Sequence, residues 1–453
     1  MVIATLVDMN TENVPLLCIL STGQCIWVWG DKLPHYAQRL TDMPRYTRLD
    51  FTSIPGLALY SAARSFYLIS ISSFITAIRI TPRDPHTLRI DNSPKSSLIM
   101  GENIFANKNK GSPCKHPSML WCNIQSLRCC DSKKLSLPDV DFTGKWILIT
   151  GANSGIGREA ALRFASWGAN IILGCRPNPP PREPSPASVV DECRAIAKIS
   201  GKLNAEFEWW EVDMASIASV QALGKRWLDT GRPLDILCNN AGISSGSKQP
   251  ILTSDGFELV HQINFLSHVL LTLTLLPSLA KAPSPRILCT TSNMQYLGVF
   301  NLEDNANKGL DIAYPNNKLY FQTWLTELQS RLAKNEEYKH IVVHGVHPGY
   351  VKTNIWNPET KSVGEWVLTK LLPIFGITAQ QGSLCIVNGA SSPALALENL
   401  KPDPKDGIVG AKFMNRIWEC TPMPHTRHPE CRRMVWDFVE KELNLGEKGL
   451  IAL

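Results

Sequence analysis

The amino-acid sequence predicts an α/β fold in which a doubly wound parallel sheet is covered by helices on both faces. Two observations support this prediction. Short apolar runs rich in β-branched residues alternate with helical stretches from residue 137 onward, a pattern typical of parallel sheets. The first run, Trp146–Ile149, leads directly into a glycine-rich turn and then a helix.

The glycine-rich turn occupies Thr150–Gly157 and has the sequence T-G-A-N-S-G-I-G. The helix predicted after it, Arg158–Trp167, stops at Gly168. A strand, a glycine turn and a helix in this order present backbone N–H groups and a helix N-terminus to a pyrophosphate. The predicted sheet is therefore of the Rossmann type.

The later elements follow at regular intervals. Between the second strand and its helix, six of the ten residues from Pro177 to Pro186 are proline, which predicts a surface loop and nothing more. Ligands of such sheets bind at the carboxyl ends of the strands, where every motif named below falls. The sequence predicts further strands at 170–173, 206–212, 234–237, 286–290 and 341–346, and helices at 189–199, 257–279 and 314–332.

Five motifs occur along these elements in a fixed order. They are T-G-A-N-S-G-I-G at Thr150–Gly157, N-N-A-G at Asn239–Gly242, Ser292, Tyr314-x-x-x-Lys318, and H-P-G at His347–Gly349. With them, residues 137–445 resemble the short-chain dehydrogenase/reductase family. The surrounding sequence, including Gly174-Cys175-Arg176, is similar to the retinol-dehydrogenase-like branch and its stand-alone fungal relatives.

The Tyr314 and Lys318 side chains are four residues apart and therefore lie on one face of a helix. A neighbouring ammonium lowers the pKa of a phenol from its usual value near 10. The resemblance implies that Tyr314 exchanges a proton with the substrate oxygen and that Lys318 also holds the nicotinamide ribose. It further implies that Ser292 hydrogen-bonds the substrate oxygen and that Asn264 supports a water-borne proton relay.

Three details near these residues bear on the assignment. Thr290 and Thr291 compete with Ser292 as the acting hydroxyl, and Ser292 is chosen by its register with the strand-end serine of the family. Pro315 requires the helix to begin close to Tyr314, because proline is tolerated only in a first turn. Asn317 stands where family members often carry serine or a small residue.

The choice of cofactor depends on the end of the second strand. A carboxylate there selects NAD, whereas arginine suits the 2′-phosphate of NADP. The sequence has Arg176 and no acid before Glu183, which predicts NADP(H). The cofactor-binding residues implied by the resemblance are Gly151, Asn153, Ser154, Gly155, Ile156, Gly157, Arg176, Asp213, Met214, Asn240, Ala241, Gly242, Tyr314, Lys318, Pro348, Gly349, Val351 and Thr353.

Apolar residues around the predicted site suggest a lipophilic carbonyl or alcohol, such as a polyketide, terpenoid, steroid or retinoid-like compound. A helix core explains the stretch at 363–375 equally well. The direction of reaction stays open, although NADP(H) in a cell favours reduction. The residues concerned are Met294, Tyr296, Leu297, Val299 and Phe300 before Tyr314, and Tyr350, Trp356 and Val363–Phe375 after Gly349.

Composition narrows the classes of function. The chain is 44% apolar and 19% charged, as a globular protein is, with a net charge of +6. Residues 1–140 hold 15 Lys+Arg against 10 Asp+Glu, so most of the positive charge lies outside the motifs and a nucleic-acid partner is not expected. Thirteen cysteines without framework spacing predict reduced thiols in an intracellular, cytoplasmic setting.

Residues 1–135 are predicted to be a poorly ordered extension, and residues 136–453 the catalytic domain. The extension is expected to pack loosely and to take no part in the active site, so that a chain beginning near Leu135 folds alone. The cysteines and the histidine between residues 114 and 130 match no zinc module, and no metal is predicted.

A membrane contact through the extension is the less favoured alternative. Ser65–Ile78 is 14 residues long, against the roughly 20 that a spanning helix needs. Extending it back to Leu57 brings in Arg64. Two other classes therefore stay open beside the enzyme: a membrane-associated protein anchored through residues 57–78, and a catalytically idle dinucleotide sensor, which the presence of both Tyr314 and Lys318 disfavours. Oligomeric state is left open.

Overall fold

The computed structural model describes residues 3–7, 16–21, 24–29, 112–127, 133–244, 250–302, 313–352, 376–450 and 453. The chain divides into two compact units, Met1–Ile104 and Phe105–Leu453. The first contains an antiparallel sheet of β1 (Ile3–Val7), β2 (Leu16–Ser21) and β3 (Gln24–Trp29), with β2 in the middle. Residues 57–78, on which the membrane alternative depends, lie outside the described residues.

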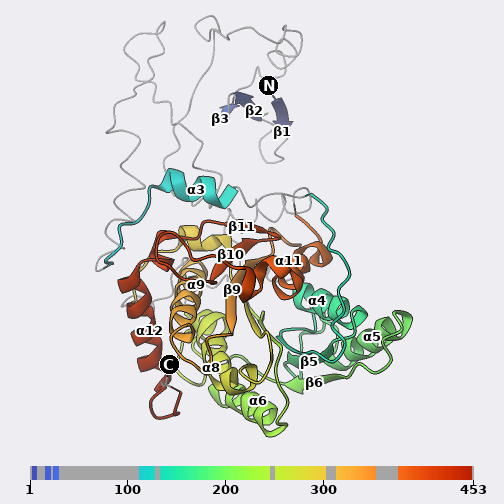
Figure 1. Ribbon diagram of the computed structural model, residues 1–453. Coiled ribbons are helices and arrows are strands. Elements are labelled where there is room, and N and C mark those ends of the chain that lie inside the picture. The colour runs from blue at the N-terminus through green and yellow to red at the C-terminus, as the bar shows by residue number, and fades with distance from the viewer. Residues whose placement is uncertain are drawn as a thin grey trace, which may run out of the picture. The chain divides into compact units, whose positions relative to one another are not determined.

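The second unit is built on one eight-stranded sheet, drawn in Figure 1. Its order is β11-β10-β9-β8-β7-β4-β5-β6, and every pairing is parallel except that of β10 with β11. The predicted doubly wound parallel sheet is confirmed. The strands are β4 (Trp146–Thr150), β5 (Asn170–Cys175), β6 (Phe207–Glu211), β7 (Ile236–Asn239), β8 (Arg286–Thr290), β9 (Val342–His347), β10 (Lys412–Asn415) and β11 (Trp418–Cys420).

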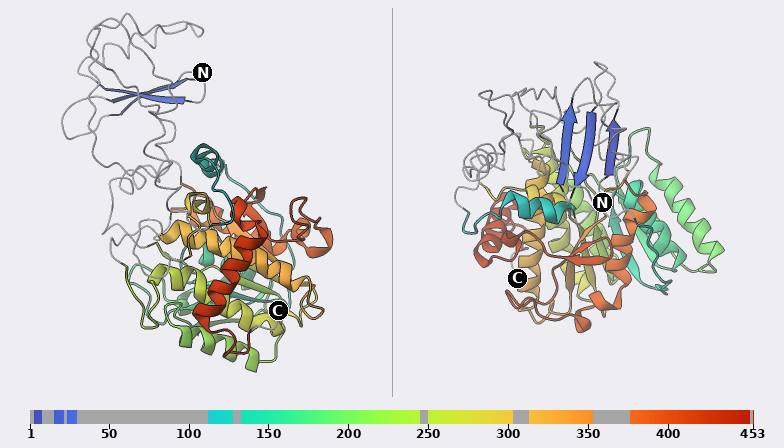
Figure 2. Two further views of the ribbon diagram at one scale, coloured as in Figure 1. Left: turned by 90° about the vertical axis from the view of Figure 1, so that its left-hand side faces the viewer. Right: turned by 90° about the horizontal axis from the view of Figure 1, so that it is seen from above.

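Helices cover both faces of this sheet (Figure 2). Because side chains alternate along a strand, Ile147 and Ile149 of β4 join one apolar core and Leu148 joins the other. The first core is covered by α4 (Gly155–Ser166), α5 (Pro186–Ile199) and α11 (Ala379–Ser391). The second is covered by α6 (Ile217–Asp229), α8 (Ser267–Leu279) and α9 (Ala313–Leu332), with α12 (Pro429–Leu443) packed on α9.

Two predicted helices differ in detail from the observed ones. The helix expected at 257–279 is interrupted, because α7 (Leu259–His261) runs into a π-helical turn, η3 (Gln262–Leu266), before α8 begins. The helix expected at 189–199 begins earlier, since Ser185 caps it by accepting from the Ser188 N–H and Pro186 takes the first turn. As Pro315 requires, α9 begins at Ala313.

Residues 112–127 depart from the expected loose extension. They include the helix α3 (Met119–Leu127), which lies against the short 3₁₀ helix η4 (Asn293–Leu297) just after β8 (Figure 1). Cys122 is completely buried in the second core, and the Trp121 ring packs edge-on against Tyr296 at 5.8 Å. The prediction of loose packing is wrong for this part of the extension.

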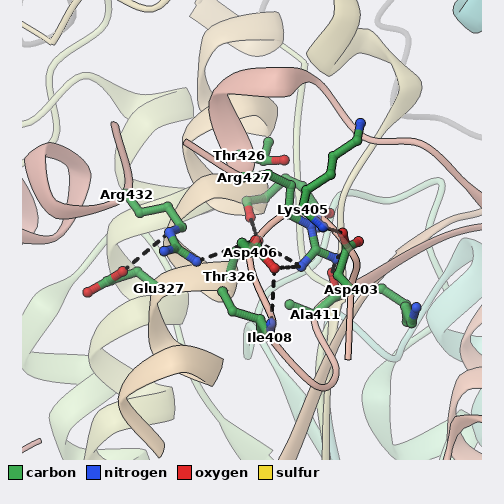
Figure 3. A network of polar contacts seen from close by, with 12 residues as sticks. Thr326, Glu327, Asp403, Lys405, Asp406, Ile408, Ala411, Thr426, Arg427 and Arg432 are labelled. Carbon is green, nitrogen blue, oxygen red and sulfur yellow. Dashed lines mark hydrogen bonds and ion pairs between the residues drawn. The ribbon is translucent and has the colours of Figure 1, made fainter. Parts of the chain in front are cut away.

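Buried ion pairs between side chains connect the C-terminal region to α9 (Figure 3). The Asp406 carboxylate lies 3.4 Å from the Arg427 guanidinium and 3.6 Å from that of Arg432. Arg432 of α12 in turn lies 3.6 Å from Glu327 of α9. The network therefore fixes the helix that carries Tyr314 and Lys318 against the chain end.

One helical stretch among the described residues, Leu259–Leu279, is long and apolar enough to cross a membrane. Its most apolar window is 83% buried inside the protein. Its role in the structure is that of a core helix beneath the sheet, as the burial of Val269, Leu270 and Leu273 shows.

Candidate active site

The glycine-rich turn connects β4 to α4. Gly151 and Gly155 have φ of 66° and 56°, a region that favours glycine. A Cβ on Gly157 would lie 2.5 Å from both the Asn240 side-chain nitrogen and the Gly151 carbonyl. Ser154, the N-cap of α4, makes no side-chain capping bond, so the first N–H groups of α4 stay available to an anion. The turn, in which Ile156 also lies, therefore has a backbone that can hold a pyrophosphate.

A second strand end closes this turn from the side. The Thr150 hydroxyl accepts from the Asn240 and Ala241 N–H groups at 2.9 and 3.0 Å. The Asn240 amide donates back to the Thr150 carbonyl at 2.9 Å. The N-N-A-G motif, ending at Gly242, is thereby fixed beside the glycine turn at the point where the strand order reverses between β4 and β7.

The proline-rich loop is more than a surface insertion. Its Glu183 carboxylate accepts a hydrogen bond of 3.0 Å from the Asn153 amide in the glycine turn. Asn153 also donates to the Pro184 carbonyl at 3.3 Å. Arg176, at the end of β5, is exposed. An acid and a base therefore both lie at this corner of the site, and the prediction that the loop has no role in the site is corrected.

The residues after β6 form a compact turn. The Asp213 carboxylate accepts from the Ala215 N–H at 2.9 Å. The Met214 carbonyl accepts from Ser267 at 2.7 Å, which ties the turn to α8. Both predicted residues therefore lie at the carboxyl edge of the sheet, the same edge as the glycine turn.

The predicted catalytic residues Tyr314, Lys318 and Ser292 come together at the end of β8. The Lys318 ammonium donates to the Thr290 carbonyl at 2.8 Å and lies 5.4 Å from the centre of the Tyr314 ring. The Ser292 hydroxyl is hydrogen-bonded to Tyr314. The neighbouring Thr291 hydroxyl is buried without a partner among the described atoms, so the choice of Ser292 agrees with the geometry.

Burial shifts both titrating groups of this cluster. It raises the pKa of Tyr314 to about 12, although the hydrogen bond from Ser292 acts in the opposite direction. It lowers the pKa of Lys318 to about 8. In the free protein at pH 7, Tyr314 is therefore a neutral phenol and Lys318 an ammonium.

Asn264 lies in the π-helical turn η3 and is fully buried. Its amide donates to the Ile243 carbonyl and accepts from the Ile243 N–H, both at 2.8 Å. The side chain thus holds the chain just after the N-N-A-G motif. One turn later, the buried His268 ring hydrogen-bonds the Ala241 carbonyl at 2.8 Å, and burial lowers the pKa of His268 to about 4.

The H-P-G motif ends β9 and turns the chain towards the glycine loop. Gly349 has φ of 86°, and Pro348 precedes it. Val351 pairs with Ile377 and also lies against α11, where a Cβ on Gly382 would meet both Val351 and Ile156. Thr353, Trp356 and residues 363–375, to which the sequence assigns cofactor or substrate contacts, lie outside the described residues.

The apolar residues after Ser292 divide into two groups. Tyr296 and Phe300 belong to the core: the Tyr296 hydroxyl donates to the Thr421 carbonyl at 2.5 Å, and the Phe300 ring stacks on His425. Val299 is buried as well. Met294 and Leu297 are partly exposed on η4 and stay candidates for a substrate surface.

Sequence reasoning missed three residues that organise the site. Thr150 was noted only as part of a motif, although a hydroxyl at a strand end is a common acceptor for neighbouring N–H groups. His268 falls within the helix predicted at 257–279, and the sequence assigns it no role. Asn293 follows Ser292 directly and gave no signal, because its partners Ser126 and Tyr350 are distant in the sequence.

Similarity to known proteins agrees with this geometry. The model of the short chain dehydrogenase family matches residues 145–364. Retinol dehydrogenase 14 of Homo sapiens is 30% identical over 312 residues, which cover 67% of this chain and 87% of that protein. Retinol dehydrogenase 13 of Homo sapiens is 29% identical, with coverage of 65% and 82%. The WW domain-containing oxidoreductase of Danio rerio is 31% identical, with coverage of 66% and 69%.

This chain belongs to the short-chain dehydrogenase/reductase family. Its similarity to retinol dehydrogenases 13 and 14 agrees with the resemblance to the retinol-dehydrogenase-like branch. As a short-chain dehydrogenase/reductase it is an oxidoreductase that binds NAD(P)(H) and acts on CH–OH or C=O groups.

Proposed function

We propose that the protein is an NADP(H)-dependent oxidoreductase that interconverts a carbonyl and an alcohol on a lipophilic small molecule, in the cytoplasm or peripherally on an intracellular membrane. The observation that carries this proposal is the convergence of Tyr314, Ser292 and Lys318 at the end of β8. These groups lie at the same edge of the sheet as the glycine turn, which leaves helix N–H groups open to a pyrophosphate.

The chain's own groups divide the work at the substrate oxygen. Neutral Tyr314 donates its proton to the oxygen during reduction, and Ser292 donates a hydrogen bond to the same oxygen. The Lys318 ammonium, held by the Thr290 carbonyl, favours the tyrosinate that results. Asn264 keeps the Ile243 segment in place. When bound, the nicotinamide supplies or accepts the hydride.

The preference for NADP(H) is proposed from the charge at the end of β5. Arg176 is exposed there, where the adenosine ribose of the dinucleotide fold lies. Glu183 is the next acid along the chain, and its carboxylate already accepts from the Asn153 amide. Arg176 is therefore the group better placed to attract a 2′-phosphate.

Two observations support the proposal of a lipophilic substrate. Met294 and Leu297 are partly exposed apolar residues on η4, immediately after Ser292. Two of the relatives are named retinol dehydrogenases, and retinol is a lipophilic alcohol.

The test is NADPH oxidation by the purified full chain across a panel of lipophilic ketones and aldehydes, with small polar carbonyls as the matched control panel. We expect turnover on members of the first panel and a higher kcat/KM with NADPH than with NADH. A protein that binds NADPH but oxidises it with no carbonyl, and reduces NADP⁺ with no corresponding alcohol, is the idle sensor instead.

A further inference from the structure

The segment 112–127 contacts the chain immediately after Ser292 at several points. The Ser126 carbonyl, near the end of α3, accepts a hydrogen bond of 3.2 Å from the Asn293 amide, and both residues are buried. The Trp121 ring packs against Tyr296, one turn further along η4. The His116 ring is hydrogen-bonded to the Gly298 carbonyl at 3.3 Å. The segment is therefore built onto η4 along its whole length.

A second attachment fixes the start of the segment. The Cys431 thiol of α12 donates a hydrogen bond to Cys114, which lowers the pKa of the Cys114 thiol. Cys122 is completely buried between these two attachments. Since α12 is itself tied to α9 through Arg432 and Glu327, the segment is supported by the helix that carries Tyr314.

Asn293 joins this segment to the catalytic hydroxyl. Its amide nitrogen donates to the Ser126 carbonyl and to the Tyr350 hydroxyl at 3.3 Å. Its amide oxygen lies 3.4 Å from the Ser292 hydroxyl oxygen. One side chain therefore bridges α3, the segment after the H-P-G motif, and Ser292.

The Ser292 hydroxyl has a single proton to donate. Its oxygen accepts from the Met294 N–H at 3.2 Å, so the proton points elsewhere. Two acceptors compete for it in the free protein, the Asn293 amide oxygen and the Tyr314 phenol oxygen. The position of the Asn293 amide thus decides how strongly Ser292 is drawn away from Tyr314.

We propose that residues 112–127 are a positioning element of the active site and that Asn293 is the positioning residue through which they act. The segment holds the Asn293 amide by the Ser126 carbonyl, and Asn293 orients the Ser292 hydroxyl. This inference rests on the proposed function, because Ser292 matters only if the carbonyl chemistry takes place. It assigns an active-site role to sequence that precedes the first strand of the family fold.

Asn293→Ala and Asn293→Asp test the two halves of the proposal in the full chain. Both variants remove the amide donor, so both should increase hydrogen exchange in α3 and lower kcat by about 10- to 100-fold. Their effects on the alkaline limb of the pH profile for reduction should be opposite. Alanine frees the Ser292 proton for Tyr314 and moves the limb to lower pH, whereas aspartate, a stronger acceptor, moves it to higher pH.

Trp121→Ala tests whether α3 itself is needed. It leaves Asn293 intact but removes the packing on Tyr296, so exchange in α3 should rise and kcat should fall. Ile124→Ala is the matched control, because Ile124 lies on the same helix and is 38% exposed. It should change neither quantity. NADPH affinity, measured by fluorescence, should stay within about twofold in all four variants, since none alters the glycine turn.

Two results would overturn the inference while leaving the proposed function intact. The first is wild-type kcat in Trp121→Ala despite faster exchange in α3. The second is an Asn293→Asp variant that keeps wild-type kcat and an unmoved pH limb. A wild-type chain that turns over no carbonyl or alcohol overturns both proposals at once, so the two failures are distinguishable.

Discussion

The His261 ring and the Asn317 side chain form a buried hydrogen bond of 2.5 Å. His261 lies three residues before Asn264, and Asn317 directly precedes Lys318, so the bond joins two elements of the candidate site. The second ring nitrogen of His261 lies 2.8 Å from the Glu442 carboxylate of α12. Asn317, the residue that departs from the family pattern, thus has a partner that explains its presence here.

This relationship predicts a pH-dependent stability. Burial favours the neutral ring, but the hydrogen bonds and charges of Glu442, Asn317 and Glu258 outweigh it, and the pKa of His261 is raised above 6.5. The stabilisation is therefore fully present below pH 6.5 and is lost as pH rises through the raised pKa. In urea unfolding, Glu442→Gln should cost about 3 kcal/mol at pH 6 and less at higher pH.

The control for that measurement is His340→Gln. His340 is a half-buried histidine that hydrogen-bonds the Ala280 carbonyl and precedes β9, at the opposite end of that strand from the H-P-G motif. Its replacement should leave the pH dependence of unfolding unchanged. A Glu442→Gln variant whose loss of stability is the same from pH 6 to pH 9 would contradict the prediction.

Tyr314→Phe should separate chemistry from binding. The substitution keeps the aromatic ring and its packing but removes the transferable proton, so kcat should fall by roughly 10²–10⁴. NADPH affinity, followed by fluorescence titration, should be unchanged. Near-normal turnover by the phenylalanine variant would assign the acid role to another group.

Lys318→Met should trade activity for stability. Burial lowers the pKa of Lys318 to about 8 from 10.5, which means that the charged ammonium form destabilises the folded protein relative to the unfolded chain. Replacing it should abolish most activity and raise the free energy of unfolding at pH 7 by up to about 3 kcal/mol. Because the unfolded chain binds more protons between pH 8 and 10.5, the gain should shrink across that range.

Lys225→Met is the matched control for this measurement. Lys225 is exposed on α6 and pairs with Asp229 at the surface. Its replacement should change the free energy of unfolding by less than about 0.5 kcal/mol. The prediction fails if Lys318→Met is less stable than the wild type at pH 7.

Arg176→Asp should shift the cofactor preference towards NADH. An aspartate at the end of β5 repels a 2′-phosphate and accepts from a 2′-hydroxyl. The quantity to measure is the ratio of kcat/KM with NADPH to that with NADH. Arg182→Asp, an equally exposed arginine in the proline-rich loop, is the control and should leave the ratio near its wild-type value. Equal ratios in both variants would mean that another group senses the phosphate.

The sheet could be predicted from the sequence because its signals are local. Runs such as Trp146–Ile149 are apolar and followed at once by turn residues, and each observed strand from β4 to β9 overlaps a predicted one. The glycine turn and the Tyr314–Lys318 pair could likewise be predicted, because the residues of each motif are close together in the sequence. The contacts that support the site join residues far apart in the sequence, as the hydrogen bond between Asn293 and Ser126, 167 residues apart, illustrates.

Three features of the structure could not be predicted, because the local sequence pattern does not reveal them. α3 is a short apolar run, M-L-W-C-N-I-Q-S-L, inside a longer segment rich in Lys, Ser and Cys, and the polar composition of that segment obscured it. Glu183 lies in a run of prolines that indicates a loop but says nothing of which turn the loop meets. The π-helical turn at Asn264 sits inside an unbroken apolar pattern, which cannot distinguish it from an ordinary helix.

The two edges of the eight-stranded sheet bear on how copies of this protein can associate. β11 is only three residues long and antiparallel to its neighbour, while glutamates at 206, 208 and 211 flank or occupy β6. Short strands and repeated like charges both discourage a further strand from adding to an edge. Any self-association of this unit is therefore expected through its helical faces. Neither edge of the sheet favours pairing with a strand of another copy, the contact through which sheets aggregate.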